Sequence, residues 1–572
     1  MNVDLIVRNG YVFNAYFKRF DKIDIIIDDG KFYYLGHVDE HKFRGRSIDA
    51  TGKYIVPGLI DCHMHIESSM TTPSSFSNAV LKYGVTTVIA EPHEIANVFG
   101  IKGIEAWLED AAQCQLDIRL AIPSSVPSTN TMLETTGGAI NEAEVTKLLQ
   151  HKKTICLGEI MNCRDLLSKQ ESKTSRLISL CKGYNPLLPI EGHCPAFMDF
   201  ELAQIIYNGV TADHTEQTPE RIEARISNGM FVQLQNKTLR KENIDFLKKH
   251  NLFEHFSIVT DDTMPHDLAF KGHLDVLVRK AISLGLTPEE AIYVTTFTPA
   301  RRMNLLDKGA IAPGKVADFL ILSDINSFSI EATYRNGVEV YNRNQPELLL
   351  KNTQNTFPKE FFSSVHVDIQ QEDDFTLHTD VAAGVARCKI MCISDGTTFI
   401  KQGEADIPII NHEIQWEDSL YALAMVCERY GKNGNKGYAL IGGNVLSAGA
   451  AATTYAHDHH NLLIVGQSKK DMVVAANEVI KQQGGYCVAH SGEIKAFAHL
   501  PIGGILYDGP VSILGEQIQK VADELGKLGY THANKIMSLS TLALPVSPYI
   551  KVTDRGLIDV QSQKVIPLYK IL

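Results

Sequence analysis

Short apolar runs alternate with amphipathic stretches through the central part of the chain, between about residues 57 and 308. The apolar runs cover residues 59–60, 85–90, 117–122, 154–160, 187–190, 209–212, 229–234 and 256–260. Stretches of helical composition lie between them, such as 76–83, 101–114, 164–181 and 221–227. Eight strands that alternate with helices predict parallel βα units, and eight such units in about 250 residues match a (β/α)8 barrel. No Gly-x-Gly-x-x-Gly motif opens the first unit, which disfavours a dinucleotide-binding, doubly wound sheet.

The two flanks of this central segment have the short alternating runs and turn signals of β-strands. On the N-terminal side, residues 5–10 end in an Asn-Gly turn and residues 23–27 form a second apolar run. On the other side, residues 333–338 repeat the Arg-Asn-Gly of the first strand. We therefore predict a small β-sandwich built from residues 1–56 and 309–345, with the barrel of residues 57–308 inserted between its halves.

The pattern of strand, turn and helix signals in residues 346–572 differs from that in the rest of the chain. Strand and turn signals, as at 437–443, are mixed with amphipathic helical stretches such as 470–483 and 515–528. We predict a separate C-terminal α/β domain there, so the whole chain is an α/β protein of three parts.

Composition narrows the class of protein. The chain has 572 residues, 44% of them hydrophobic and 21% charged, the balance of an ordinary globular protein. A net charge of −12 without a Lys/Arg-rich run argues against a nucleic-acid partner. No apolar stretch approaches the roughly 20 residues that span a bilayer, and the N-terminus lacks the pattern of a signal peptide. Ten scattered cysteines without Cys-x-x-Cys spacing fit a reduced, cytoplasmic protein.

Metal-binding side chains follow most of the predicted strands of the barrel. In chain order the strand ends carry His63 and His65, then Glu91, His93 and Glu94, and then Glu159, His193, His214 and Asp261. Functional side chains of such a barrel lie at the carboxyl ends of its strands, so these residues are expected to converge. On the first strand the two imidazoles, at positions i and i+2, point the same way and can chelate one metal.

Four neutral imidazoles and two carboxylates can hold two divalent cations. Because a carboxylate has two oxygens, Glu159 can bridge the cations, and bound cations lower the pKa of water to make a hydrolytic nucleophile. Asp261, the last of the ligands, would lie close enough to take the proton and return it. The pattern therefore predicts a hydrolytic metal site at the barrel mouth.

Other roles for some of these residues stay open. Glu159 could instead cap the following helix or pair with Arg164, and Asp261 and Asp262 could form an N-cap pair. His93 and Glu94 exceed what two metal ions need, so we favour contact with the substrate or with the ligands.

The C-terminal domain carries a histidine cluster of its own, His457, Asp458, His459 and His460. No matching distant carboxylate and histidine accompany it in the sequence, so we favour a turn before the strand at 462–465. The cluster can still approach the active site from outside the barrel.

Several of these motifs resemble a known family. The run at 56–65, which ends in His-Met-His, resembles the amidohydrolase superfamily, as do the later single ligands and the closing Asp. Residues 66–70, 91–97 and 158–162 resemble the bacterial adenine deaminases, and so do 309–314, 457–461 and 544–546. The resemblance covers nearly the whole chain.

The resemblance implies specific roles for the residues at the strand ends. The metal ligands would be His63, His65, His193, His214 and Asp261, with Glu159 as the bridging ligand in place of a carbamylated lysine. Two divalent ions are expected, manganese or iron, with zinc also able to fill the site. The reaction would be hydrolytic attack on C6 of adenine, a purine-salvage reaction in which Asp261 shuttles the proton.

The remaining expectations concern the substrate and assembly. Glu67, His93 and Glu94 are the candidate substrate contacts, and the partners expected are a small nucleobase and a second copy of the chain, in a homo-oligomer with a dimer favoured. We expect no membrane partner.

The chain also departs from the family pattern at two places near the barrel mouth. Residues 232–237 read Val-Gln-Leu-Gln-Asn-Lys where the family usually has Met-Ile-Arg-Glu-Gly-Ser, and Thr263 replaces a basic residue. These changes keep two alternatives open: an amidohydrolase acting on another aminopurine or a cyclic amide, and a non-catalytic paralogue.

Overall fold

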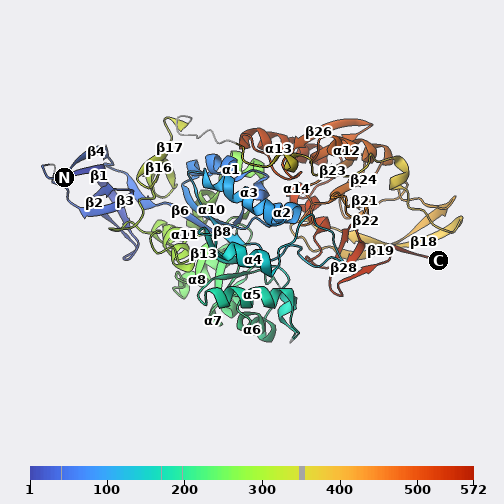
Figure 1. Cartoon of the computed structure of the whole chain (residues 1–572), viewed down its shortest axis with the longest axis horizontal. Helices are drawn as coiled ribbons and strands as arrows, with labels where there is room; N and C mark the ends of the chain where they lie inside the picture. The colour runs from blue at the N-terminus through green and yellow to red at the C-terminus, as the bar shows by residue number, and fades with distance from the viewer. Residues whose placement is uncertain (40, 169, 196, 347–354) are drawn as a thin grey trace.

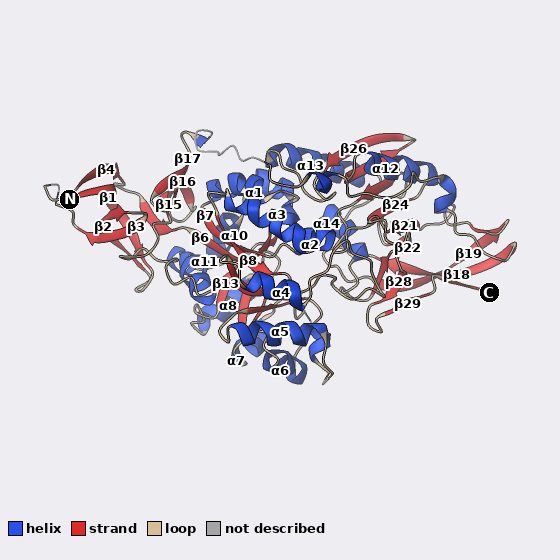
Figure 2. Ribbon diagram, viewed as in Figure 1, coloured by secondary structure: helices blue, strands red, loops and turns tan. Residues whose placement is uncertain are grey.

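The computed structural model describes residues 1–39, 41–168, 170–195, 197–346 and 355–572. The molecule is elongated, with the N-terminus at one end and the C-terminus at the other (Figure 1). A β-rich part, a central helical part and a second β-rich part follow one another along its length (Figure 2).

Both flanks of the central segment contribute strands to one sheet. Its order is β17-β16-β15-β5-β1-β2-β3, with β4 also paired to β1. The strands are β1 Asn2–Asn14, β2 Arg19–Asp28, β3 Lys31–Gly36, β4 Arg44–Asp49, β5 Tyr54–Pro57, β15 Phe319–Asp324, β16 Ser329–Arg335 and β17 Val338–Asn342. Hydrogen bonds join them into one continuous sheet, whereas we predicted two layers. The core still collects side chains from both flanks, including Leu5, Ile25, Phe319 and Tyr334.

Parallel strands form the centre of the molecule, as the alternating pattern predicts. One sheet has the order β10-β9-β8-β7-β6-β14 and another the order β11-β12-β13. The strands are β6 Leu59–His65, β7 Val85–Ala90, β8 Asp117–Ile122, β9 Thr154–Ile160, β10 Ile190–Gly192, β11 Ala212–Asp213, β12 Phe231–Leu234, β13 Phe256–Ile258 and β14 Asp261–Asp262. β14 pairs in parallel with β6, so the last strand lies beside the first. The two sheets meet where the backbone N–H of Thr211 donates to Ile190 O at 2.9 Å.

The helices between these strands lie around them (Figure 2). They are α1 Pro73–Val80, α2 His93–Phe99, α3 Ile101–Ala112, α4 Glu142–Leu149, α5 Lys173–Tyr184, α6 Asp199–Tyr207, α7 Pro219–Ser227, α8 Lys241–Lys249, α9 Pro265–Phe270, α10 Leu274–Ser283 and α11 Pro288–Arg302. Three strands, β10, β11 and β12, begin later than the apolar runs suggest. In the first of them, Pro189 has no N–H to donate and Leu187 is exposed, so regular pairing of β10 starts only at Ile190.

The C-terminal part is built on a ten-stranded sheet of order β20-β19-β18-β22-β21-β24-β23-β25-β26, with β30 paired to β18. Its strands are β18 Ala383–Cys392, β19 Lys401–Ile410, β20 Glu413–Ile414, β21 Ala422–Cys427, β22 Lys436–Gly442, β23 Ala450–Thr453, β24 Leu462–Gly466, β25 Gly485–His490, β26 Glu493–His499 and β30 Tyr569–Ile571. A separate sheet contains β27 Ile550–Thr553, β28 Gly556–Asp559 and β29 Lys564–Ile566.

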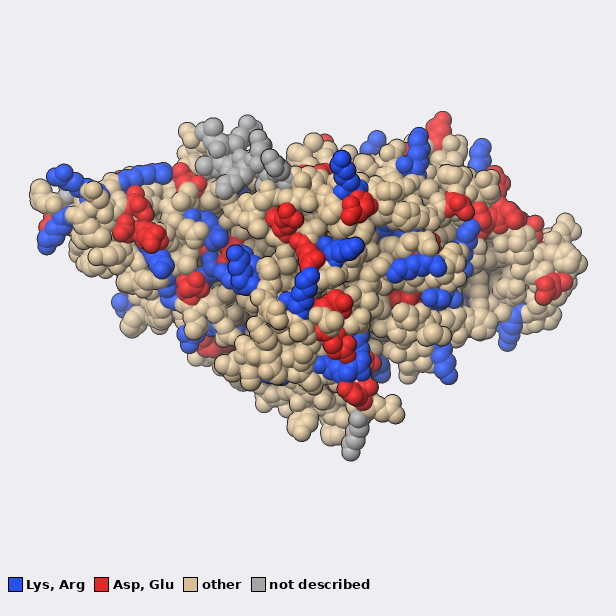
Figure 3. All heavy atoms as spheres, in the orientation of Figure 1, with Lys and Arg blue, Asp and Glu red and all other residues tan. Residues whose placement is uncertain are grey.

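This part also contains helices. They are α12 Lys469–Lys481, α13 Val511–Lys527 and α14 Lys535–Ser540. Helix α13 packs against α9 and touches α1, so the core runs across the junction. On the face shown in Figure 3, basic and acidic side chains are interspersed. Within the described ranges, no helix is long and apolar enough to cross a membrane.

Candidate metal centre

His63 and His65 lie at the carboxyl end of β6, where every residue is buried. Their rings lie edge to face with centroids 5.4 Å apart. His63 Nε2 has no hydrogen-bond partner although it is buried. A buried nitrogen without a hydrogen-bond partner lowers the stability of the folded protein unless a ligand binds it. The strand therefore presents two imidazoles toward one point, as the i, i+2 spacing predicts.

Glu159, near the end of β9, faces three of the predicted histidines. Its Oε2 lies 3.0 Å from His193 Nδ1 and 3.3 Å from His214 Nε2. Its other oxygen, Oε1, lies 3.6 Å from His65 Nε2. Burial opposes ionisation, but the imidazoles of His214 and His193 hold the pKa of this carboxyl well below its usual range. One carboxylate thus faces two groups of imidazoles, the arrangement that a bridging ligand requires.

Asp261, the first residue of β14, completes the cluster. Its Oδ1 lies 3.6 Å from Nε2 of both His63 and His65, and 3.9 Å from His214 Nε2. The residue has φ of 60°, a left-handed backbone conformation that is unusual outside glycine. Such strain is retained where the surroundings fix it, often at functional sites. Burial opposes ionisation here too, but His214 and His63 keep the pKa of Asp261 well below its usual value.

The donor set fits divalent cations. The ligand atoms of His63, His65 and Asp261 lie within 4.8 Å of one another, and so do those of His63, Glu159 and His214. Burial and the neighbouring His63 lower the pKa of His214 to about 3, so its imidazole is neutral and able to ligate. Histidine nitrogen and carboxylate oxygen together suit first-row transition metals. The structure brings all six predicted ligands together.

The alternative roles of these residues are not observed. Arg164 lies over the ring of Phe197 instead of pairing with Glu159. The helix after β14 begins with Met264 at its N-cap, so neither Asp261 nor Asp262 caps it. The side chain of Asp262 accepts a hydrogen bond from Ser68 Oγ.

Two further buried carboxylates, Glu91 and Asp61, accept hydrogen bonds from the chain next to the ligands; the sequence analysis placed Glu91 only among the strand-end residues and gave Asp61 no role. Glu91 Oε2 accepts from the backbone N–H of Glu159 at 2.6 Å. Asp61 Oδ2 accepts from Thr260 Oγ1 at 2.7 Å, just before Asp261. Burial raises the pKa of both carboxyls to about 7. The available signal was the position of Asp61 within β6, which carries two ligands, and of Glu91 directly after β7.

Contacts of the preceding residue and of Gln235 hold His214 in place. The preceding Asp213 pairs with Arg225 of α7 in a completely buried ion pair and also accepts from the backbone N–H of Cys194 at 3.0 Å. Gln235 Nε2 donates to His214 O at 2.9 Å. The departure from the family pattern at 232–237 thus includes a residue that contacts the backbone of a candidate ligand. Thr263, the other departure, lies between β14 and α9.

The three candidate substrate contacts have different surroundings. Glu67 is completely buried, and neither of its carboxylate oxygens has a hydrogen-bond partner. The ring of His93 lies 4.6 Å from that of His65. Glu94 faces away from the ligands and meets His457 and His460 of the C-terminal part. The histidine cluster of that part therefore reaches the barrel mouth, in a loop that precedes β24.

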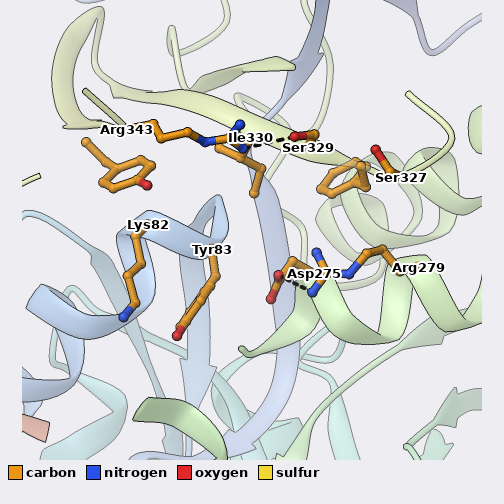
Figure 4. Close-up of a pocket in the computed structure, with 10 residues that line it drawn as sticks. Lys82, Tyr83, Asp275, Arg279, Ser327, Ser329, Ile330 and Arg343 are labelled. Atoms are coloured by element: carbon orange, nitrogen blue, oxygen red, sulfur yellow. Dashed lines mark hydrogen bonds and ion pairs between the residues drawn. The ribbon is translucent and has the colours of Figure 1, made fainter. Parts of the chain in front are cut away.

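A surface pocket elsewhere carries none of these ligands. It lies between Tyr83 on one side and β16 and β17 on the other, and Figure 4 shows Asp275 and Arg279 side by side on helix α10. Arg279 Nη2 pairs with Asp275 Oδ2 at 2.8 Å, and Lys82 and Arg343 also line the pocket.

Comparison with known proteins places these features in context. A model described as the amidohydrolase family matches residues 54–175 and 192–340, and one described as the adenine deaminase C-terminal domain matches residues 397–564. The chain is 47% identical to an adenine deaminase of Clostridium perfringens, with 100% of both chains covered. It is 47% identical to an adenine deaminase 2 of Shouchella clausii, covering 100% of this chain and 99% of the relative.

More distant similarity extends to solved structures. A β-aspartyl dipeptidase from Fervidobacterium islandicum AW-1 aligns with a TM-score of 0.47 and 19% identity, covering 61% of this chain and 99% of that one. A D-hydantoinase from Thermus sp. aligns with a TM-score of 0.45 and 16% identity, covering 60% and 96% respectively.

Proposed function

The chain belongs to the adenine deaminase family of amidohydrolases, and from that premise we propose that it hydrolyses adenine to hypoxanthine and ammonia. The observation that carries the proposal is the convergence of four histidines, Glu159 and Asp261 at one buried point. A metal-dependent hydrolase that acts on a C–N bond needs such a centre.

The cluster is suited to a pair of divalent ions. We assign His63, His65, His193, His214 and Asp261 as ligands and Glu159 as the bridge, with manganese or iron as the metals. Bound cations of this kind lower the pKa of water, which supplies a nucleophile at neutral pH. The chain's own contribution is to hold the ligands rigidly, through Glu91 behind Glu159 and Thr260 before Asp261.

We assign Asp261 to proton transfer. The water oxygen bonds to C6 of adenine, the bond from C6 to the amino nitrogen breaks, and the leaving nitrogen departs as ammonia. The proton lost by water must therefore reach the ring or the leaving amine. The low pKa of Asp261 keeps its carboxylate ionised and able to accept that proton.

Glu67 and His93 are the residues we propose to contact the purine. Burial raises the pKa of Glu67 to about 7, so its carboxyl can donate to or accept from a ring nitrogen. The ring of His93 lies 4.6 Å from that of His65, and its Nε2 lies 3.5 Å from Glu94 Oε1, so the imidazole is held close to the metal centre. Glu94, the third candidate, is engaged by His457 and His460 instead.

The parallel strands support a (β/α)8 barrel as the catalytic part. We propose residues 57–308 as this barrel, residues 1–56 and 309–345 as the flanking β-domain, and residues 346–572 as the C-terminal domain. A homodimer in the cytoplasm is retained as an expectation.

An amidohydrolase for another aminopurine or a cyclic amide is the second candidate. The observation in its favour is Gln233, whose Nε2 donates to Glu191 Oε2 at 2.7 Å inside the barrel. Together with the bond from Gln235 to His214 O, it shows that the departures at 232–237 touch the interior of the site. The complete set of ligands argues against a non-catalytic paralogue.

The test is steady-state turnover of adenine beside a panel of other aminopurines and cyclic amides, with manganese-loaded and iron-loaded protein. We expect kcat/KM for adenine to exceed that for every other compound by at least about 10-fold, a difference of roughly 1.4 kcal/mol. Glu159→Ala serves as the inactive control. Preference for another ring compound would transfer the assignment to the second candidate, and turnover of none would favour a non-catalytic protein.

A further inference from the structure

The barrel and the C-terminal part meet at a second cluster of metal-binding side chains. Glu94 lies in the first turn of α2, while His457 and His460 lie in the loop between β23 and β24. The three residues are buried, with exposures of 0%, 5% and 0%. Their donor atoms lie within 4.8 Å of one another. The carboxylate that we missed in the sequence is therefore present, about 360 residues away along the chain.

Each oxygen of Glu94 faces one imidazole. His457 Nδ1 lies 2.7 Å from Oε1, and His460 Nε2 contacts Oε2. Asp458 Oδ1 lies 3.4 Å from His457 Nδ1, so a second carboxylate is at hand. Two imidazoles and one carboxylate form the set that holds divalent iron in many oxygenases and that suits manganese and zinc.

Several donor atoms of the cluster have no hydrogen-bond partner although they are buried. They are both ring nitrogens of His457, Nδ1 of His460, Oε1 of Glu94 and Oδ2 of Asp458. The contact between His457 and Glu94 is thus close without hydrogen-bond geometry, and His63 Nε2 and His214 Nδ1 of the metal centre are unpartnered in the same way. Leaving such groups unpaired inside a protein destabilises the fold.

The charges of the cluster also call for a cation. Among the described residues, the ion pairs of Glu94 and Asp458 involve only histidines and no lysine or arginine. Glu67 and Glu134, both buried in the same region, have unpartnered oxygens as well. Buried carboxylates without a paired cation are costly.

The loop that carries the two histidines is held in place independently of any ligand. The completely buried Arg429 donates through Nε to His460 O and through Nη2 to Gly503 O, the latter at 2.7 Å. Asn461 Nδ2 donates to Thr135 O at 2.8 Å, which ties the loop to the barrel part. The donors are therefore positioned before a ligand arrives.

We propose that Glu94, His457 and His460 bind a divalent transition-metal ion that is separate from the proposed catalytic pair. Asp458 balances part of its charge. The ion links α2 to the C-terminal loop and thereby fixes His93, whose Nε2 lies 3.5 Å from Glu94 Oε1 and whose ring lies beside that of His65. The site has imidazole donors, so magnesium and calcium, which prefer oxygen ligands, do not satisfy it.

The test compares the metal content of full-length variants. Each protein is stripped with dipicolinate, equilibrated with excess MnCl₂, dialysed and measured by mass spectrometry. We expect Glu94→Gln and His460→Gln each to hold about one ion per chain fewer than the unaltered protein. His459→Gln is the matched control, because His459 belongs to the same loop but its ring lies outside the donor set. It should hold the full number.

Two outcomes would overturn the site: equal metal content in all four proteins, or an equal loss in His459→Gln. Anomalous diffraction at the manganese edge on crystals of the unaltered protein does not depend on the folding of any variant. A peak between Glu94, His457 and His460 would support the site, and its absence beside peaks at Glu159 would refute it in favour of a hydrogen-bonded His-Glu-His network. Adenine turnover is measured separately, so the proposed function can fail while this site stands.

Discussion

At the scale of single residues, the sequence predicted which strand-end residues converge, but it did not predict the hydrogen bonds that support them. His63, His65, Glu159 and Asp261 each end an apolar run, and parallel strands bring such ends together. The supporting contacts connect positions that no local pattern links. Glu91 reaches the backbone of Glu159 across 68 residues, for example. The spacing of residues within a strand predicts which way their side chains point. A hydrogen bond between two strands depends on the register of the folded sheet instead.

The first prediction at this scale concerns Asp261. Replacing it with Asn removes the proton acceptor and leaves the size of the side chain nearly unchanged. We expect kcat for adenine to fall by about 10²–10⁴-fold, the usual contribution of a general base. Asp262→Asn is the control, because that carboxylate accepts a hydrogen bond from Ser68 and is not among the proposed ligands, and we expect less than about a 10-fold loss for it. Equal losses in the two variants would remove Asp261 from the proton pathway.

The second prediction concerns Lys551, a fully buried lysine whose Nζ donates to Thr398 O at 2.7 Å and Thr541 O at 2.8 Å. Burial lowers its pKa from 10.5 to about 7. Between these values the unfolded chain binds a proton at this site that the folded chain does not. Stability should therefore rise with pH through this window, by up to about 1.4 kcal/mol per pH unit.

Lys551→Met isolates this effect. The variant lacks the titrating group, so the difference in urea midpoint between the unaltered protein and the variant should move in favour of the unaltered protein as pH rises from about 7 to 9. A difference that stays constant over that range would show that the lysine titrates normally in the folded state.

At the scale of elements, the alternation of apolar and amphipathic stretches predicted the type and order of the central strands. It did not predict the residues at which those strands begin and end. Only residues 256–258 of the last predicted run, 256–260, form a strand, β13. A separate strand, β14, begins just beyond the run at Asp261 and pairs with β6, which carries His63 and His65. The strand β10 starts after Pro189 because proline cannot donate to a ladder. Tertiary pairing decides such boundaries, and apolar runs do not encode it.

A substitution at Gly158 tests how closely β9 must approach the side chain of Glu91. A methyl group at this position would lie 2.3 Å from Glu91 Cδ and 2.4 Å from its Oε2. Gly158→Ala should push Glu91 away from the backbone of Glu159, lowering stability by about 1–3 kcal/mol and metal content together with it. Gly183→Ala in α5 is the control, since nothing lies within 4 Å of the added carbon and alanine favours a helix by about 0.5–1 kcal/mol. Normal metal content in Gly158→Ala would show that Glu91 does not position the bridging ligand.

At the scale of the whole molecule, the junction between barrel and C-terminal part was the least predictable feature. The histidine cluster at 457–460 looked like an isolated turn because its partner, Glu94, lies on a distant helix. The hydrogen bond from Asn461 Nδ2 to Thr135 O ties the loop of the cluster to the central part of the chain. A contact between residues that lie far apart in the sequence leaves no pattern in the sequence around either of them.

Removal of metal should weaken the assembled molecule. Without cations, the buried carboxylates and imidazoles at both clusters lack partners, so chelation should lower Tm by about 5 °C or more. Adding manganese or zinc should restore it, whereas magnesium should not. An unchanged Tm in protein shown to be metal-free would contradict the assignment of these side chains as ligands.

The central claim is that this chain deaminates adenine by hydrolysis, and one measurement addresses it directly. Manganese-loaded protein is given adenine in water enriched in ¹⁸O, and hypoxanthine and ammonia are quantified together. We predict one ammonia for each hypoxanthine, with the label of the solvent at C6. No hypoxanthine from adenine, or product whose C6 oxygen lacks the solvent label, would contradict the proposed reaction.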